Sequence, residues 1–491
     1  MNRLNFLLIM ADQLVPFLTG AYGHPVVHTP HLNRLVEEGV RFDAAYSPCP
    51  LCAPARACLM TGKYISHNRV YDNAAPLASD EPTICHYLTN AGYETIASGK
   101  LHYVGPDQLH GFRRRLTTDV YPSMFSWLPT SKRRAEERFI DRRSHAAGYA
   151  IPRVGVRTWT QFLNYDAETQ YRALEYLYSR SIGDANEAEP FFLTVSFHCP
   201  HDPFCVTQEL WDRYEGQPIE IPEYPPNMEE TYSTMDRWLN AYHGTDRINI
   251  QDPESLIQLR RSYYGLVSWI DDKVGELLKA LKDTGLYDNT VVIFTSDHGD
   301  MLAEKNMVQK RSFYEWSSHV PLILRLPDGW RAGTQCRAPV SLMDLAPTIL
   351  ELAGVTEWLP MDARSLLDCV DGSQDEERVV FSESHTNGVY APCFMVRKGV
   401  YKYIYIHGED SQLFDLSQDA GEWHNLVGDP AHAATERELH ALIQDNFDAD
   451  AIEADLQKSL LMRGIIREAT EHNDTHWDYA SHFDATRQYV R

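Results

Sequence analysis

The chain has 491 residues, of which 43% are hydrophobic and 23% are charged, a composition typical of a globular protein and not of a disordered or fibrous one. This length exceeds what one small core needs, so we expect one large domain and a smaller one. The formal net charge of -24 argues against nucleic acid as a partner, because phosphate binding requires a basic surface.

The first predicted element is a buried strand over residues 4–10, which ends shortly before Asp12. Comparable apolar runs follow later in the chain, separated by stretches with helical spacing of apolar residues, such as 256–281. The further strands are expected at residues 191–197, 290–295 and 321–324. Buried strands that alternate with helices indicate a mostly parallel sheet covered by helices on both faces. The sequence therefore predicts an α/β fold for this part.

The pattern changes from about residue 377 onwards. Short strands joined by turns are expected at residues 379–383, 393–397, 400–406 and 413–415, which predicts a small antiparallel sheet. A helical segment over about 434–472 and an aromatic-rich tail follow. We therefore divide the chain into a main domain, residues 1–370, and an α+β C-terminal subdomain, residues 371–491. Aromatic side chains so near a terminus indicate docking, and we expect the tail to take part in oligomerisation.

The cellular location is predicted from the N-terminus and the cysteines. The apolar run at residues 4–10 is shorter than the core of a signal peptide, and no stretch approaches the roughly 20 apolar residues that cross a bilayer. The nine cysteines are odd in number and scattered, so a secreted disulfide framework is not expected. These features favour a cytoplasmic protein with no membrane partner.

Acids and histidines follow three of the predicted strands. Asp12 comes after the first, His201 follows the second, and Asp297 and His298 follow the third. In sheets of parallel strands the ligand binds beyond the carboxyl ends of the strands. We therefore expect these side chains to meet in one site.

A short motif around Cys52 gives that site a chemistry. The run Cys52-Ala53-Pro54-Ala55-Arg56 matches the Cys-x-Pro-Ser/Ala-Arg signal of the sulfatases, and the chain resembles the type I, formylglycine-dependent sulfatase family. The resemblance implies an alkaline-phosphatase-like fold and conversion of Cys52 to formylglycine, whose hydrate attacks sulfur with one hydroxyl and expels sulfate with the other. Cys49 and Cys52 also form a Cys-x-x-Cys pair, which can signify redox chemistry or half a zinc site.

The same resemblance implies one divalent metal ion. The family places its ion at the positions of Asp12, Asp297 and His298, beside the nucleophile made from Cys52. Carboxylate oxygens suit Ca²⁺ first, with Mg²⁺ and Mn²⁺ as alternatives. The chain departs from the common pattern in having Gln13 where many sulfatases have a second acid, and His298 where asparagine is common. This pattern resembles the branch that contains choline sulfatases and phosphonate monoester hydrolases.

Further motifs of the family supply the remaining catalytic candidates. Lys100 and His102 lie in a Gly-Lys-x-His motif, and His201 lies in Pro-His-x-Pro. By resemblance, Lys100 holds a sulfate oxygen and His102 takes the proton when sulfate leaves. His201 and Lys310 stabilise and help to protonate the leaving oxygen. Arg56 hydrogen-bonds the formylglycine hydroxyl.

Segments outside these motifs resemble the choline sulfatases, among them residues 70–75, 99–112, 116–122 and the tail around 477–478. A trimethylammonium group has no N–H donor, so it is recognised by aromatic faces and by carboxylates at a distance. The resemblance implies a choline pocket formed by Asn73, Trp127, His145, Glu383 and Asp478. We therefore expect hydrolysis of choline sulfate to choline and sulfate.

Three alternatives remain open at the level of sequence. The same nucleophile and metal ion serve phosphonate monoester hydrolases or phosphodiesterases, and sulfatases of other small alkyl or aryl sulfates. Without a maturation enzyme that modifies Cys52, the chain would be a catalytically inactive protein that binds sulfate or choline esters. The predicted partners are thus a small sulfate ester, a formylglycine-generating or equivalent enzyme, and further copies of the chain in a dimer or tetramer.

Overall fold

The structure is a computed structural model of the chain, and it describes residues 3–129, 151–181, 189–245, 248–370 and 377–477. Its centre is an eight-stranded sheet with the order β11-β2-β10-β9-β1-β7-β4-β5. The strands are β1 Asn5–Ala11, β2 Val40–Phe42, β4 Glu94–Gly99, β5 Arg114–Arg115, β7 Phe191–Ser196, β9 Thr290–Ser296, β10 Leu322–Arg325 and β11 Thr334–Cys336. Neighbouring strands are parallel except at β10, which runs antiparallel to both β9 and β2. The predicted α/β fold with a mostly parallel sheet is confirmed.

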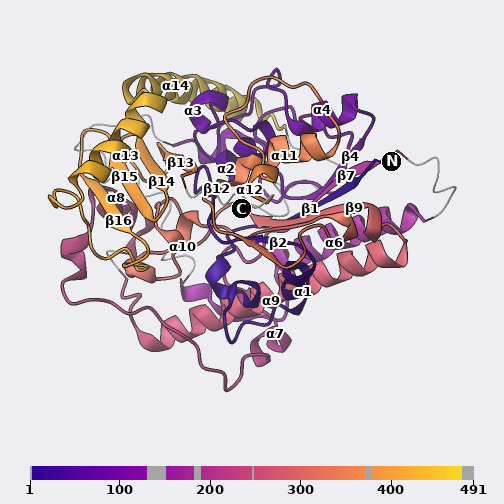
Figure 1. The fold of residues 1–491 in the computed structure, drawn as a ribbon, viewed down its shortest axis with the longest axis horizontal. Coiled ribbons are helices and arrows are strands. Elements are labelled where there is room, and N and C mark those ends of the chain that lie inside the picture. The colour runs from indigo at the N-terminus through magenta and orange to yellow at the C-terminus, as the bar shows by residue number, and fades with distance from the viewer. Residues whose placement is uncertain (1–2, 130–150, 182–188, 246–247, 371–376, 478–491) are drawn as a thin grey trace.

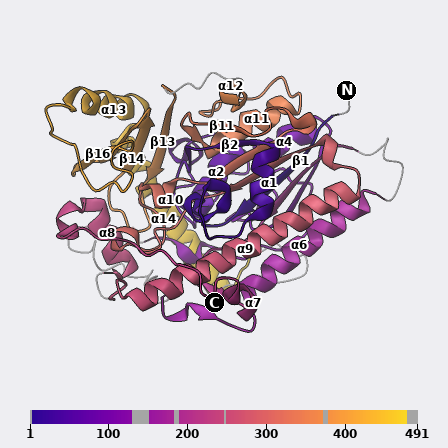
Figure 2. The same cartoon turned by 60° about the horizontal axis from the view of Figure 1, so that its bottom comes forward.

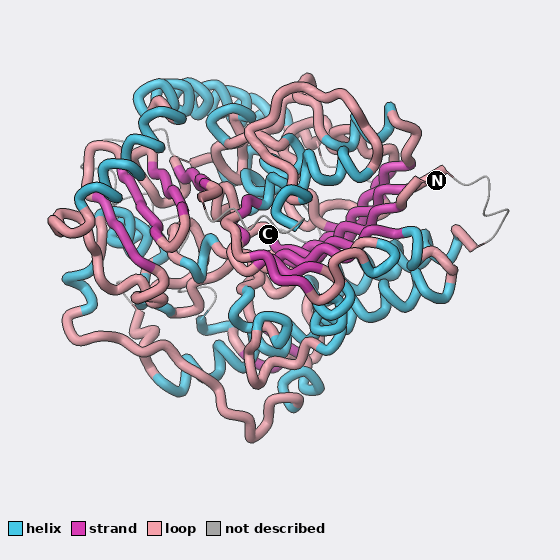
Figure 3. The backbone as a smooth tube through the Cα atoms, in the orientation of Figure 1, coloured by secondary structure: helices cyan, strands magenta, loops and turns pink. Residues whose placement is uncertain are grey.

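Helices cover both faces of this sheet because its strands are apolar on both faces. In β1 the side chains of Leu7 and Ile9 pack in one core with the helices α1 Pro30–Glu38, α6 Gln161–Ser179 and α9 Pro253–Asp283. Those of Phe6 and Leu8 pack on the opposite side, with α2 Cys52–Thr61, α4 Ile84–Asn90 and α11 Leu345–Leu352. Figures 1 and 2 show the two helical layers, and Figure 3 shows the strands between them.

The small sheet near the C-terminus is antiparallel and has four strands in sequence order. They are β13 Val379–Ser384, β14 Cys393–Lys398, β15 Tyr401–Ile406 and β16 Ser411–Asp415. The single helical segment expected over 434–472 is two helices, α13 Ala433–Asn446 and α14 Ala449–Asn473. They separate because Phe447 is extended and buried while the Asp448 carboxylate caps α14 by accepting from the Ala451 N–H at 3.0 Å.

Shorter elements connect these parts. They are α3 Ile65–Asn68, α7 Gln208–Asp212, α8 Thr234–His243, α10 Glu315–Ser318, α12 Leu367–Val370, and the two-stranded pairs β3 Ala45–Tyr46 with β12 Val340–Ser341 and β6 Gly155–Val156 with β8 Cys205–Val206. Within the described ranges no helix is long and apolar enough to cross a membrane.

Buried ion pairs join the C-terminal elements to the preceding part of the chain. Arg463 of α14 binds the carboxylate of Asp72 through both Nη atoms, at 2.6 and 2.8 Å, and both side chains are buried. On β15, Lys402 bonds Glu422 at 2.8 Å and Glu315 of α10 at 2.5 Å. A fully buried charge is tolerated only when it is paired in this way. The division of the chain into two domains at residue 370 stays a prediction.

Candidate active site

Four neighbouring parallel strands end at one edge of the sheet, and polar side chains follow each of them. Asp12 comes after β1, Lys100 after β4, His201 after β7, and Asp297 and His298 after β9. The strand order β9-β1-β7-β4 places these chain segments side by side. The convergence at the carboxyl ends of the strands is therefore a consequence of parallel pairing.

Helix α2 brings Cys52 to the same place. Cys52 is the first residue of the helix, and Arg56, one turn later, lies on the same face. Pro54 is accommodated here because the N–H groups of a first helical turn have no acceptor within the helix. One of those N–H groups, that of Ala53, donates to the Asn73 side-chain oxygen at 3.0 Å. Asn73 thus holds the end of the helix that carries the cysteine.

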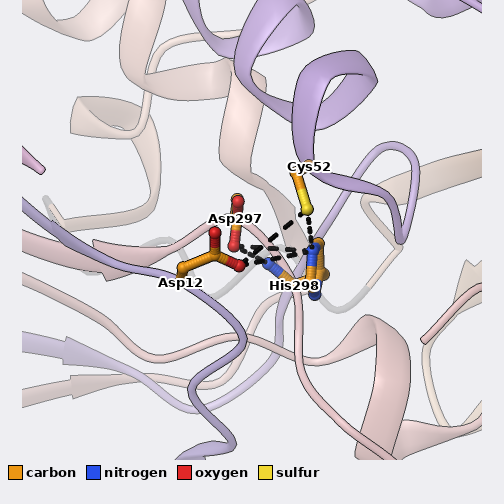
Figure 4. A group of neighbouring side chains, drawn as sticks. All are labelled: Asp12, Cys52, Asp297 and His298. Carbon is orange, nitrogen blue, oxygen red and sulfur yellow. Dashed lines mark hydrogen bonds and ion pairs between the residues drawn. The ribbon is translucent and has the colours of Figure 1, made fainter. Parts of the chain in front are cut away.

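Asp12, Cys52, Asp297 and His298 form a fully buried cluster, with one ligand atom of each within 4.8 Å of the others. The Cys52 sulfur lies 3.1 Å from Nε2 of His298 and 3.9 Å from Oδ1 of Asp12. The His298 Nε2 lies 3.8 Å from that same Asp12 oxygen and 3.7 Å from Oδ1 of Asp297. Figure 4 shows the four side chains pointing toward one another.

Two cations contact the carboxylates of this cluster. Arg56 donates from Nε to Oδ2 of Asp297 at 2.9 Å and Lys100 contacts Asp12. Burial lowers the pKa of Lys100 to about 7. Burial would raise the pKa of Asp297, but His298, Arg56 and Lys100 hold it below its usual range. Burial also raises the pKa of the Cys52 thiol, which Lys310, Arg56 and Arg311 oppose.

The donor set fits a divalent cation. Burial lowers the pKa of His298 to about 3, so its imidazole is neutral. Its Nδ1 lies 2.9 Å from the Gly299 carbonyl oxygen, which places the ring proton on Nδ1 and leaves the Nε2 lone pair facing the cluster. Two carboxylates, this nitrogen and the atom at position 52 are ligands that hard and borderline ions accept. The cluster could therefore hold a metal ion.

A second group of side chains lies beside the cluster. His102 is 3% exposed, and neither of its ring nitrogens has a hydrogen-bond partner among the described residues. Its ring centroid lies 4.8 Å from that of Tyr121 and 5.7 Å from that of Trp127. The ring centroids of Tyr121 and Trp127 are 4.7 Å apart, and the Lys100 ammonium nitrogen lies 4.4 Å from the Tyr121 ring centre. Tyr121 and Trp127 together are called the aromatic wall below.

His201 and Lys310 contact each other close to Tyr121. The Lys310 ammonium nitrogen lies 2.7 Å from Nε2 of His201, and Nδ1 of His201 lies 2.8 Å from the Asp202 carbonyl oxygen. Nδ1 therefore carries the proton and Nε2 accepts from Lys310. The Tyr121 hydroxyl lies 3.1 Å from Nε2 of His198 and 3.4 Å from Nε2 of His201. Sequence reasoning assigned no role to His198 or Tyr121, because a lone tyrosine or histidine gives no signal in the sequence.

The predicted choline-pocket residues are placed unevenly. Trp127 ends the short 3-10 helix Phe125–Trp127 and lies in the aromatic wall. Glu383 is fully buried, accepts hydrogen bonds from the Ser66 N–H and hydroxyl at 3.3 and 3.1 Å, and lies 2.9 Å from His385. Its carboxylate is therefore engaged within the fold. His145 and Asp478 fall outside the described residues.

Comparisons with known proteins agree with this arrangement. A family model described as Sulfatase matches residues 4–355, more than half of the chain. A second model, described as N-sulphoglucosamine sulphohydrolase, C-terminal, matches residues 303–448.

The chain belongs to the sulfatase family.

It is thus a sulfuric ester hydrolase, and the predicted family is confirmed. Among the proteins to which the chain is similar are two curated relatives and one solved structure. The Choline-sulfatase of Rhizobium meliloti (strain 1021) is 37% identical over 99% of this chain and 95% of its own. The Multifunctional alkaline phosphatase superfamily protein PehA of Trinickia caryophylli is 29% identical over 89% of this chain and 94% of its own. The crystal structure of the Phosphonate Monoester Hydrolase of Agrobacterium radiobacter superposes with a TM-score of 0.73, at 23% identity, over 92% of this chain and 96% of that one. This last likeness confirms the alkaline-phosphatase-like fold.

Proposed function

We propose that this sulfatase hydrolyses small alkyl sulfate monoesters through formylglycine made from Cys52, and that choline sulfate is a substrate. The observation that carries the proposal is the burial of Cys52 at the start of α2, in one cluster with Asp12, Asp297 and His298, where Lys100 contacts Asp12. Formylglycine supplies, when formed, a geminal diol with one hydroxyl for attack on sulfur and one for the later release of sulfate. A divalent ion, Ca²⁺ first, would be held by Asp12, Asp297, His298 and the oxygen at position 52, where it supplies polarisation of a sulfate oxygen.

The other side chains orient the ester and move protons. Lys100, whose ammonium borders the cluster, would bind a sulfate oxygen, and Arg56 would hydrogen-bond the nucleophile on its own helix face. His102 has two unpartnered ring nitrogens and would accept the proton when sulfate leaves. Lys310, held by His201, would donate to the leaving oxygen as the S–O bond breaks. These roles follow from the contacts described above and from the resemblance to the family.

Choline recognition is supported by the aromatic wall and by the choline-sulfatase relative. The rings of Tyr121 and Trp127 lie beside that of His102, and a quaternary ammonium is attracted to aromatic rings. Asn73, half-buried at the end of α2, would border the same space. Glu383 would attract the choline ammonium only from a distance, because its carboxylate oxygens already bond to Ser66 and His385. His145, Asp478, the maturation enzyme, the dimer or tetramer and the cytoplasmic location stay predictions.

The experiment that tests the proposal compares kcat/KM for choline sulfate, nitrophenyl sulfate and a phosphonate monoester. The enzyme is first checked by intact mass, because conversion of cysteine to formylglycine lowers the mass by about 18 Da. We expect choline sulfate to be preferred over both other substrates. Preference for the phosphonate monoester would instead assign the chain to the phosphonate monoester hydrolases and would overturn the choline proposal.

Replacement of Trp127 in the aromatic wall should lower kcat/KM for choline sulfate more than for other sulfate esters. Trp127→Ala is expected to lower kcat/KM for choline sulfate by about 30-fold more than for nitrophenyl sulfate, since a desolvated cation–π contact contributes about 2 kcal/mol. The matched control is Trp159→Ala, because Trp159 is 48% exposed and packs against Trp269. Equal losses on both substrates in the Trp127 variant would contradict a choline site at this wall.

A further inference from the structure

Arg311 is a buried cation beside the candidate active site that the mechanism above does not use. It follows Lys310 directly and is 7% exposed. Its backbone has a φ of 89°, in a region that side chains with a β-carbon seldom adopt. Such strained positions persist where the surroundings fix them, and they gather at functional sites.

The guanidinium of Arg311 has few partners. One Nη atom donates to Nε2 of His243 at 2.8 Å, and the Tyr242 ring centre lies 5.3 Å from the guanidinium carbon. Its Nε is buried and has no acceptor among the described residues. Because His243 accepts at Nε2, its ring proton is on Nδ1 and the imidazole is neutral. The neutral imidazole does not compensate the positive charge of Arg311. In the described parts of the chain Arg311 forms no ion pair with a carboxylate.

Other buried arginines of the described chain are treated differently. Most form an ion pair with a carboxylate at 3.0 Å or less, namely Arg56, Arg115, Arg260, Arg378 and Arg463. Arg397 donates to the Tyr46 hydroxyl and lies close enough to Glu315 to lower its pKa. Arg325 donates to the carbonyl oxygens of Tyr287 and Thr290 at 2.7 and 3.0 Å. Arg311 has only one neutral nitrogen as an acceptor, which is unusual for a buried guanidinium.

The position of this charge points to the substrate. Arg311 directly follows Lys310 in the chain, and the Lys310 ammonium lies 2.7 Å from Nε2 of His201, so the backbone of Arg311 borders the candidate active site. The other cations near the nucleophile already face the ester centre: Arg56 and Lys100 contact Asp297 and Asp12, and Lys310 faces His201. A guanidinium offers two parallel N–H groups that match a carboxylate. No carboxylate of the described residues forms this pair with Arg311, so a carboxylate on a bound ligand would find an unpaired guanidinium.

We propose that Arg311 is a substrate-binding residue that takes a carboxylate carried by the leaving group of the sulfate ester. This inference rests on the proposed sulfate ester hydrolysis and narrows its substrate class. Small alkyl sulfates with a carboxylate engage Arg311, whereas choline sulfate engages only the aromatic wall. A zwitterionic ester such as serine O-sulfate, with an ammonium and a carboxylate, engages both.

The first arm of the test uses two esters of equal length that differ in the acidic group. With mass-checked wild-type enzyme, 3-sulfooxypropanoate is expected to exceed propyl sulfate by about 10- to 100-fold in kcat/KM, since hydrogen bonds to charged groups are strong when buried. A ratio near one or below would overturn the inference even if choline sulfate is hydrolysed well.

The second arm uses variants. Arg311→Met removes the charge and should bring that ratio to about one, while Arg311→Lys should retain part of it. The matched control is Arg325→Met, because Arg325 is equally buried and lies at the end of β10 that pairs with Val292, near the start of β9. We expect the control to keep the wild-type ratio. An equal loss on both esters in Arg311→Met would assign Arg311 to the sulfate group and would contradict a role in reading the leaving group.

A binding measurement keeps this inference separate from the proposed catalysis. In Cys52→Ala no turnover is expected, so calorimetry can measure the Kd of both esters at equilibrium. The carboxylate ester should bind about 10- to 100-fold more tightly than propyl sulfate, and the difference should vanish in Cys52→Ala/Arg311→Met. If neither ester is hydrolysed by the wild type but this difference in Kd is found, the proposed function fails and the Arg311 site stands. Equal Kd values would overturn the Arg311 site.

Discussion

Cys52→Ala should abolish turnover of every sulfate ester while leaving the fold intact. Loss of a covalent nucleophile costs on the order of 10⁴- to 10⁶-fold in kcat, and alanine fits the first turn of α2 without strain. The measurement is kcat on nitrophenyl sulfate together with the circular dichroism spectrum and Tm. Activity within tenfold of wild type would rule out Cys52 as the origin of the nucleophile.

The helix itself offers a matched control. Cys58 lies on α2 and is as buried as Cys52, and its described partner is the Asn68 side-chain amide at 3.5 Å. Cys58→Ala should retain wild-type kcat and lose only some stability, through the small cavity left behind. A third variant, Cys52→Ser, keeps one hydroxyl but cannot provide the second, so we expect at most one equivalent of product per chain. Multiple turnovers by this serine variant would contradict the need for a diol.

Removal of the divalent ion is the second change with a large expected effect. A chelator should lower kcat by at least about 10³-fold, because a metal at the reacting oxygen contributes several kcal/mol of charge stabilisation. Addition of Ca²⁺, Mg²⁺ or Mn²⁺ should restore activity, and the ion that does so at the lowest concentration identifies the metal. Elemental analysis should find one ion per chain. Full activity of metal-free enzyme would refute the proposed role of the cluster.

Thermal stability gives an independent measure of the same site. An ion at about 100 times its Kd stabilises the folded chain by about 2.7 kcal/mol, so Tm should rise on addition of the restoring ion. Asp297→Asn should weaken or abolish this rise. Asp271→Asn should retain it, because Asp271 is equally buried but accepts from the His31 and Leu32 N–H groups at the start of α1, at 3.1 and 2.8 Å. An undiminished rise in the Asp297 variant would place the ion elsewhere.

The substrate pocket shows where reasoning from the sequence stops. Glu383 was expected in a choline pocket, yet its carboxylate is engaged by Ser66. No role was assigned to Tyr121 or Arg311 from the sequence, because a single tyrosine or arginine is most often a packing or surface residue. Their surroundings come from segments far apart in the chain, such as His243 for Arg311 and His198 for Tyr121. Which side chains line a pocket thus depends on how distant loops pack.

The sequence by itself determined the family, the fold class and the residues of the buried cluster. It could do so because these features are local: continuous apolar runs specify buried strands, a short motif surrounds Cys52, and acids that follow parallel strands must meet at one edge of the sheet. The tertiary structure alone decided which buried cations form ion pairs and that the guanidinium of Arg311 forms none among the described residues. Ion pairing depends on contacts a few ångströms long between residues such as Arg56 and Asp297, 241 positions apart, and no local pattern encodes them. For that reason Cys52 could be identified from five residues, whereas the isolated charge of Arg311 became visible only in the folded chain.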